Sequence, residues 1–269
     1  PRDSFICAYI YVSYIYNTTR IGQTPPTIKQ LLSYAFHDTH EFYTDAAKYW
    51  ENIPATVDGM LGGFGFISHT DIDGSQLFLK SLFKLKDPPQ KTYALDCGSG
   101  IGRITKNLLT KHFKHVDLVE QCSKFLDEAK VSLSCCSSKI GEFYPLGLQD
   151  FCPTTKKYDV IWCQWVLGHL KDDDLINFFK KCIPALRDNG ILVVKENVTS
   201  SNTLEIDTQD SSMTRPLAEL KASFDEAGLI CIKEQLQHRL PKGLYPVYMF
   251  ALRPAKLPSI SQTNDNDEQ

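Results

Sequence analysis

An excess of basic residues is absent from this 269-residue chain, which has 29 Lys and Arg residues against 32 Asp and Glu residues and a net charge of −3. Proteins that bind nucleic acid generally carry a strong basic excess. Hydrophobic residues make up 42% of the chain and charged residues 23%, close to the averages for globular domains. We therefore expect a protein with a sizeable core and no nucleic-acid partner.

A long apolar run is also lacking at the start of the chain. The aromatic run at residues 5–16 has twelve residues, whereas a membrane helix needs about 20. Arg2 is the only basic residue before this run, and residues 17–20 make a poor signal-peptide cleavage site. We expect no membrane association, and we treat residues 1–40 as a poorly defined extension to which no function is assigned.

Paired cysteine motifs are missing although the chain has nine cysteines. None forms Cys-x-x-Cys, the count is odd, and several cysteines fall inside apolar runs, so neither a disulfide framework nor a metal site is expected. Buried free thiols are typical of a reducing compartment. The expected location is therefore the cytoplasm, the nucleus or both.

The region before the core, residues 41–90, is expected to contain N-terminal helices and a glycine-rich lid loop. Hydrophobic spacing predicts one or two helices within residues 28–50 and another at residues 76–85. Between them, residues 57–66 contain four glycines, which favour a shaped loop and disfavour a stable helix.

Short apolar runs alternate with helical periods across residues 91–253. Strands are predicted at residues 93–96, 116–120, 158–165 and 191–195, with a closing antiparallel pair at residues 229–235 and 245–252. Helices are predicted at residues 104–111, 124–133, 172–186 and 216–227. Strands that are apolar on both faces and alternate with helices indicate an α/β fold, in which helices cover both sides of a parallel sheet. The polar residues 254–269 predict a disordered tail.

The first strand of this domain leads into a glycine loop. Gly98, Gly100 and Gly102 alternate before Arg103 begins a helix. Small residues let a ligand approach the backbone where a parallel strand ends, and a helix N-terminus offers free N–H groups. The spacing Gly-x-Gly-x-Gly differs from the Gly-x-Gly-x-x-Gly of dinucleotide folds. Arg103 could pair with a carboxylate, and S-adenosylmethionine carries one.

Later strand ends supply further candidate cofactor contacts. Glu120 closes the second strand, 22 residues after Gly98, where an acid typically binds the ribose hydroxyls of a nucleotide cofactor. Both NAD and S-adenosylmethionine have such a ribose. Residues 147–150 are expected beside the adenine. The fourth strand ends at Gln164, with Trp165 and His169 just beyond it, whereas Trp162 is expected in the core.

Several segments together resemble the protein α-N-terminal methyltransferases, which methylate the α-amine of proteins whose exposed N-terminus reads X-Pro-Lys. The segments are residues 49–65, 94–106, 147–151, 158–170 and 210–212. The likeness runs in one order and nearly one spacing from about Tyr43 to Arg253. It implies a Rossmann-like, seven-stranded, mostly parallel sheet with helices on both faces, an N-terminal helical lid, and S-adenosyl-L-methionine as cofactor.

The resemblance also implies roles for individual residues. The implied cofactor contacts are Gly98, Gly100, Arg103, Glu120, Leu148, Gln149 and Gln164. The implied peptide channel and proline seat comprise Trp50, Leu61, Ile67, Trp165 and Tyr245. Asn197 would hold the peptide backbone, Asp207, Asp210 and Ser212 would receive the lysine, and His169 and Asp210 would be catalytic. Aspartate is common in the family where Glu120 and Glu196 stand. The segment before Asp207 is one residue longer than usual, which makes the position of Asp207 less secure.

The residue types fit this chemistry on physical grounds. An α-amine has a pKa of about 7.7–8.0, so a nearby His or carboxylate must accept its proton before the nitrogen can attack. Carboxylates such as Asp207 and Asp210 suit a lysine, and aromatic walls such as Trp50 and Trp165 suit a proline.

Three alternatives share parts of this pattern. A small-molecule N- or O-methyltransferase would share the cofactor half but would not need an acidic pair under a lid. A non-catalytic homologue would bind the cofactor without turnover. A dehydrogenase would bind NAD in the glycine loop.

Overall fold

The computed structural model describes residues 39–255. The chain divides into a first unit, residues 1–42, and a second unit, residues 43–269. Helix α3 (Thr39–Asn52) confirms the later part of the helical prediction for residues 28–50. Residues 28–38, nearly all of the predicted extension and the predicted tail from residue 256 lie outside the described residues.

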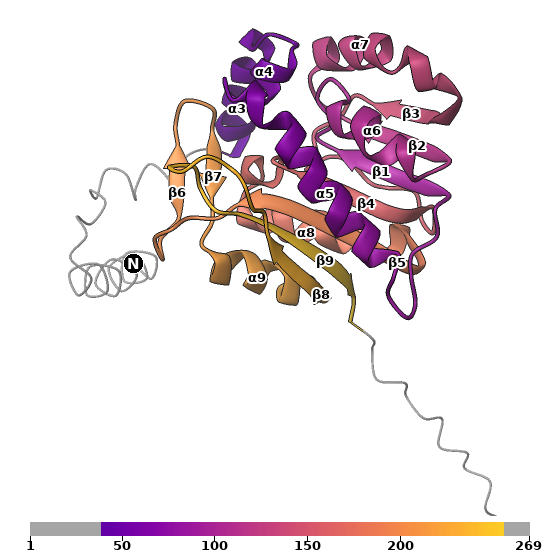
Figure 1. Ribbon diagram of the computed structural model, residues 1–269. Coiled ribbons are helices and arrows are strands. Elements are labelled where there is room, and N and C mark those ends of the chain that lie inside the picture. Colours follow the sequence, from indigo (N-terminus) through magenta and orange to yellow (C-terminus); the bar gives the residue numbers. More distant parts are fainter. Residues whose placement is uncertain (1–38, 256–269) are drawn as a thin grey trace, which may run out of the picture. The chain divides into compact units, whose positions relative to one another are not determined.

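The core of the second unit is a seven-stranded sheet with the order β3-β2-β1-β4-β5-β9-β8 (Figure 1). Its strands are β1 (Tyr93–Cys97), β2 (His115–Val119), β3 (Ile140–Tyr144), β4 (Tyr158–Gln164), β5 (Leu186–Asn197), β8 (Leu229–Leu236) and β9 (Val247–Pro254). Neighbours from β3 to β5 pair in parallel, and β9 runs antiparallel to both β5 and β8. The predicted mostly parallel seven-stranded sheet is therefore confirmed.

Helices cover both faces of this sheet because its strands are apolar on both faces. Consecutive residues of β1, such as Ala94 and Leu95, are fully buried on opposite sides of the sheet. On one side lie α8 (Asp172–Cys182) and α9 (Leu217–Glu226). On the other lie α5 (Ser68–Leu82), α6 (Arg103–Asn107) and α7 (Ser123–Ser132). Short 3-10 helices complete the order: η1 (Gly65–Ile67), η2 (Leu109–Lys111), η3 (Ser134–Lys139), η4 (Leu167–His169) and η5 (Ile183–Ala185).

The lid region corrects one prediction. Residues 57–66 were expected to be a loop without helix, but helix α4 (Val57–Met60) forms one turn there. Thr56 caps it, since its hydroxyl accepts a hydrogen bond from the backbone N–H of Gly59 at 3.1 Å. The turn ends where Gly62 and Gly63 take positive φ values. The glycines therefore terminate the helix rather than prevent it.

Several boundaries also differ from the predictions. The helix expected at residues 76–85 is α5, which runs from Ser68 to Leu82, and the helix expected at residues 104–111 divides into α6 and η2. The helix expected to reach residue 186 ends at Cys182, and β5 begins at Leu186. A two-stranded hairpin, β6 (Glu205–Asp207) with β7 (Ser212–Thr214), was not predicted. Its three-residue polar strands are too short to show the alternation from which strands are recognised.

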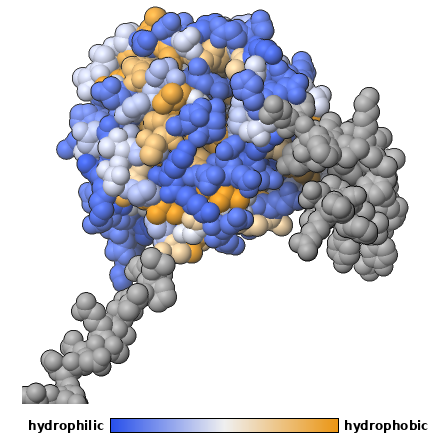
Figure 2. Space-filling model, turned by 180° about the vertical axis from the view of Figure 1, so that it is seen from behind, coloured by the Kyte–Doolittle hydropathy of each residue, from blue (hydrophilic) through white to orange (hydrophobic). Residues whose placement is uncertain are grey.

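The face shown in Figure 2 is mostly hydrophilic, with hydrophobic residues in small groups. Such scattered exposed apolar residues are ordinary on a protein surface. Within residues 39–255, no helix has the length and apolar character needed to cross a bilayer. The same residues include no cluster of His, Cys, Asp and Glu suited to a metal ion.

Candidate active site

Two adjoining pockets open where β1, β2, β4 and β5 reach their carboxyl ends, the usual ligand edge of a parallel sheet. With their open mouths included, their volumes are about 950 and 1200 Å³. The walls of both contain Trp50, Met60, Trp165 and His169. These four side chains therefore mark the boundary where a ligand in one pocket would meet a ligand in the other.

The glycine loop forms one wall of the first pocket. Gly98, Ser99 and Gly100 line it, and the two glycines have φ values of 67° and 53°. A Cβ on Gly100 would lie 2.7 Å from the sulfur of Met60, which belongs to the lid. The Ser99 hydroxyl is buried and has no hydrogen-bond partner among the described residues. Such an orphaned donor in a pocket wall indicates a missing polar ligand.

Glu120 lies beside this loop, as predicted. One carboxylate oxygen accepts a hydrogen bond from the backbone N–H of Gly100 and the other from that of Cys122, each at 2.9 Å. Burial raises the pKa of this carboxyl, and the backbone donors oppose the rise. Its three backbone donors, which include Gln121, leave lone-pair capacity unused, so the carboxylate could still accept a hydroxyl hydrogen from a ligand.

The remaining cofactor candidates line the same pocket. Leu148 is buried and Gln149 is half-buried at one end. Arg103 and Gln164 lie at the other end, and both contact Asp71 of helix α5. Gln164 also accepts a hydrogen bond from Trp162, whose indole is fully buried, as predicted. Thus the sequence placed Gln164 at the pocket correctly but missed that partners within the protein bind both ends of its amide.

Trp165 stands between the pockets in a strained conformation. Its φ of 53° is unusual for a bulky residue. The indole N–H donates to the side-chain oxygen of Asn197 at 3.1 Å. The Arg103 guanidinium and the Lys195 ammonium lie 5.7 and 5.9 Å from the ring centre. These contacts hold the ring at the pocket boundary and offset the cost of its backbone conformation.

His169 makes the second link between the core and the lid. Its Nε2 accepts a hydrogen bond from the indole N–H of Trp50 at 3.1 Å, and its Nδ1 lies 3.4 Å from the carbonyl oxygen of Ser211. This arrangement fits a neutral ring that carries its proton on Nδ1. Burial lowers the pKa of His169, although Asp210 and the Ser211 carbonyl oppose the shift. Both ring nitrogens are thus already engaged.

The hairpin β6–β7 carries the acidic candidates. Asp210 lines the second pocket, and its Oδ1 is buried without a hydrogen-bond partner among the described residues. Ser212 lines the same pocket, whereas Asp207 is exposed and outside the lining. Burial raises the pKa of Tyr49, and the charges of Asp210 and Asp207 raise it further. The hairpin therefore places one carboxylate inside the pocket and the other outside its lining, where its charge acts on Tyr245 of the pocket wall.

The remaining peptide-channel candidates also line the second pocket. Leu61 and Ile67 are buried lid residues, and Asn197 lies at the end of β5. Tyr245 donates a hydrogen bond to Glu205 at 2.5 Å, which, with burial and nearby acids, raises its pKa to about 12. The structure therefore brings together every predicted substrate residue except Asp207.

Some pocket residues were not identified from the sequence. Met60 lies between the pockets and Val166 borders the first. Glu196 borders the second, and one of its carboxylate oxygens accepts hydrogen bonds from the backbone N–H groups of Val166 and Leu167, each at 2.8 Å. Burial raises the pKa of Glu196 from 4.5 to about 7 despite these donors.

This raised pKa makes a prediction for stability. Because the folded protein holds the Glu196 proton more tightly than the unfolded chain, the stabilisation is complete below pH 4.5 and is lost as pH rises through 7. The difference corresponds to roughly 3 kcal/mol. Glu196→Gln keeps the acceptor oxygen but cannot ionise. We expect its free energy of unfolding, measured by urea titration, to fall less between pH 5 and pH 8 than that of the wild type. Equal falls in both proteins would contradict the assignment.

Comparisons with known proteins agree with this geometry. A family model described as AdoMet-dependent proline di-methyltransferase matches residues 38–253. The N-terminal Xaa-Pro-Lys N-methyltransferase 1 of Homo sapiens is 45% identical over 226 residues, which cover 83% of this chain and 100% of the human protein. The alpha N-terminal protein methyltransferase 1 of Drosophila melanogaster is 48% identical and covers 80% of this chain and 77% of its own length. A solved structure of a SAM-dependent methyltransferase from Leishmania major is 40% identical, with a TM-score of 0.75 over 80% of this chain and 85% of that one.

Proposed function

Because this chain belongs to the AdoMet-dependent proline di-methyltransferase family, we propose that it methylates the α-amine of proteins whose exposed N-terminus reads X-Pro-Lys, with S-adenosylmethionine as donor. The observation that best supports this reaction is the arrangement of the two pockets. Two pockets meet at Trp50, Met60, Trp165 and His169, and the second holds the unpartnered carboxylate oxygen of Asp210. This arrangement provides a donor site and an adjoining acceptor site that contains a proton acceptor.

The first pocket fits the cofactor. Glu120 would bind the ribose hydroxyls, the backbone at Leu148 and Gln149 would border the adenine, and Arg103 with Gln164 would lie at the methionine end. Two features favour a polar ligand in this pocket: the Ser99 hydroxyl has no partner among the described residues, and Gly98 and Gly100 expose their backbone in the pocket wall. When bound, the cofactor supplies an electrophilic methyl group on a sulfonium.

The second pocket suits an extended N-terminal peptide. The aromatic rings of Trp50 and Trp165 and the apolar Leu61 and Ile67 offer walls for a proline ring. The side-chain oxygen of Asn197 accepts a hydrogen bond from Trp165, which leaves its amide N–H groups to bind a peptide carbonyl. Asp207 and Ser212 would receive the lysine in the third position. A peptide held this way directs its α-amine toward the pocket boundary.

The proton of that amine has one well-placed acceptor. Asp210 offers a buried oxygen with no hydrogen-bond partner within residues 39–255, whereas both nitrogens of His169 are engaged. We assign Asp210 as the general base and His169 as a catalytic neighbour that shapes the amine site with Trp50. Loss of the proton frees the nitrogen lone pair for in-line attack on the methyl group.

Substrate choice provides the direct test. Peptides beginning Ser-Pro-Lys and Ser-Pro-Gln are incubated together with labelled cofactor. We expect the lysine peptide to be methylated up to about fivefold faster, because the exposed Asp207 carboxylate would stabilise its ammonium by up to about 1 kcal/mol. An α-N-acetylated Ser-Pro-Lys peptide is the control, since it keeps the lysine and blocks the proposed acceptor. Equal labelling of both free peptides, or labelling of the acetylated one, would refute the proposal, as would no labelling at all.

The proposed location is the cytoplasm, the nucleus or both. The eight cysteines of the described residues are all free. Cys97, Cys122, Cys163 and Cys182 are buried. Such thiols are typical of a reducing compartment.

A further inference from the structure

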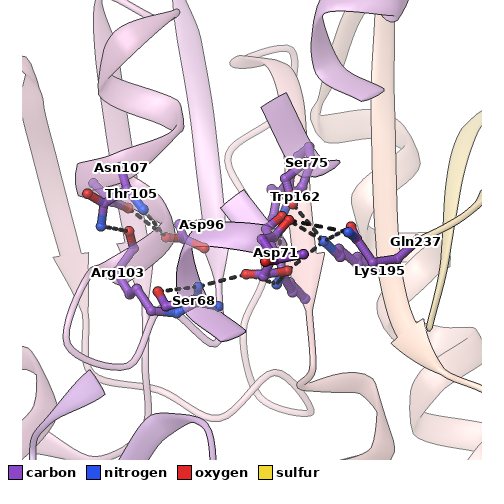
Figure 3. A network of polar contacts seen from close by, with 12 residues as sticks. Ser68, Asp71, Ser75, Asp96, Arg103, Thr105, Asn107, Trp162, Lys195 and Gln237 are labelled. Atoms are coloured by element: carbon purple, nitrogen blue, oxygen red, sulfur yellow. Dashed lines mark hydrogen bonds and ion pairs between the residues drawn. The ribbon is translucent and has the colours of Figure 1, made fainter. Parts of the chain in front are cut away.

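A buried polar network joins the lid side of the protein to the methionine end of the first pocket (Figure 3). Asp71 of α5 lies at its centre, with no exposed surface. One carboxylate oxygen is 2.5 Å from the Lys195 ammonium and the other is 2.7 Å from the Arg103 guanidinium. The Gln164 amide donates to both oxygens, at 2.8 and 3.0 Å. Asp71 therefore binds both cofactor candidates at that end.

Lys195 is fully buried in β5, yet its environment suits the charged form. Its Nζ lies within hydrogen-bond distance of Asp71, the Ser75 hydroxyl at 2.9 Å and the Gln237 side-chain oxygen at 2.9 Å. The Asp71 backbone carbonyl, at 3.1 Å, is a fourth acceptor, so all three N–H bonds of an ammonium are satisfied. Burial lowers the pKa of Lys195, and the Asp71 carboxylate opposes this shift.

Asp71 is also held in its charged form. Burial alone would raise the pKa of its carboxyl, but Lys195 and Arg103 lower the pKa below the ordinary value. Arg103, Lys195 and Asp71 together carry one positive charge in excess in a desolvated place. The buried Asp96 carboxyl beside Arg103 offsets only part of this excess near neutral pH, because burial raises its pKa to about 7. Buried charges without a counterion are costly. The excess lies beside a pocket, where an anionic ligand could neutralise it.

We propose that Asp71 and Lys195 are positioning residues for the cofactor. Asp71 fixes Arg103 and Gln164, and Lys195 supplies the charge that leaves Arg103 free to attract the carboxylate at the methionine end. This inference rests on the proposed function only in its choice of cofactor. It explains why a buried lysine, which touches neither pocket, stands in the strand that leads to Glu196 and Asn197.

Binding of two related ligands tests the proposal without catalysis. S-adenosylhomocysteine carries the amino-acid carboxylate, whereas 5′-methylthioadenosine keeps the adenosine and sulfur but lacks it. We expect Lys195→Met to weaken S-adenosylhomocysteine by about tenfold or more in calorimetry and to change 5′-methylthioadenosine less than about twofold. Equal weakening of both ligands, or no change in either, would overturn the proposal.

Two further variants keep the test informative if Lys195→Met does not fold. Gln237→Glu adds a second carboxylate beside Lys195 at nearly constant shape, so it balances the charge and should produce the same selective weakening of S-adenosylhomocysteine. An unchanged ratio of the two affinities in this variant would contradict the charge argument.

Lys181→Met is the matched control, because Lys181 donates to the backbone of Gln149 near the other end of the pocket. Its loss should leave the ratio unchanged.

These measurements use no peptide. If the Ser-Pro-Lys peptide is not methylated but Lys195→Met still discriminates between the ligands, the proposed acceptor is wrong and the positioning role stands. If the peptide is methylated and discrimination is absent, only the positioning role fails.

Discussion

Asp210→Asn is expected to lower the turnover of a Ser-Pro-Lys peptide by about 10²- to 10⁴-fold, the usual contribution of a general base. Asparagine preserves the shape of the side chain but cannot accept a proton. Asp210 lines the second pocket and not the first, so the affinity for S-adenosylhomocysteine should not change. Initial rates and calorimetry on the same preparation measure both effects.

Asp207→Asn is the matched control for this change. It removes the same charge from the same hairpin, but Asp207 is exposed and lies outside the pocket lining. Its carboxylate accepts a hydrogen bond from the backbone N–H of Gln209 at 2.8 Å. We expect a rise in the KM for the peptide of up to about fivefold, with little change in kcat, as for an exposed ion pair. Comparable losses of kcat in both variants would point to the charge of the hairpin as a whole and would remove Asp210 as the specific base.

Sequence patterns predicted many residues of the first pocket's lining because their geometry is local. Gly98, Gly100 and Glu120 follow directly from two strand ends that pair in parallel and in register. Trp162 and Gln164 are two residues apart in β4 and face the same side of the sheet, where they share a hydrogen bond. Gln164 reaches the pocket because it ends the strand, whereas Trp162 lies inside the sheet and is buried. Every strand that the sequence predicted by range is present, with shifts of one to five residues at the ends.

The partners of these residues could not be predicted because they come from distant parts of the chain. Asp71 and Lys195 are 124 residues apart, and each would ordinarily be expected on the surface. Trp50 and His169 are separated by 119 residues, so the sequence suggested both as site residues but not their hydrogen bond. That bond matters for the mechanism, because it engages the nitrogen with which His169 would otherwise accept a proton.

Gly98→Ala is expected to reduce the affinity for S-adenosylhomocysteine by about 100-fold. Gly98 has a φ of 67°, and an added Cβ would lie 2.4 Å from a methyl carbon of Val166. Val166 has little room to move, because its backbone N–H is bound by Glu196. Overpacking of this kind costs about 1–3 kcal/mol, and the positive φ adds about 1–2 kcal/mol. Without a ligand the loop can relax, so most of this cost would appear when binding restores its shape, and about 3 kcal/mol corresponds to roughly 100-fold.

Gly228→Ala separates the two parts of that cost. Gly228 has a φ of 81°, but an added Cβ there would meet nothing within 4 Å, and the residue lies far from both pocket linings at the end of α9. It should lower the melting temperature through its backbone conformation alone and leave the affinity for S-adenosylhomocysteine unchanged. If Gly98→Ala behaves like Gly228→Ala in both measurements, close packing of the loop against Val166 does not shape the pocket. A loss of affinity confined to Gly98→Ala would instead show that the loop binds its ligand through backbone held in one place by its neighbours, with the glycine required for fit as much as for its φ.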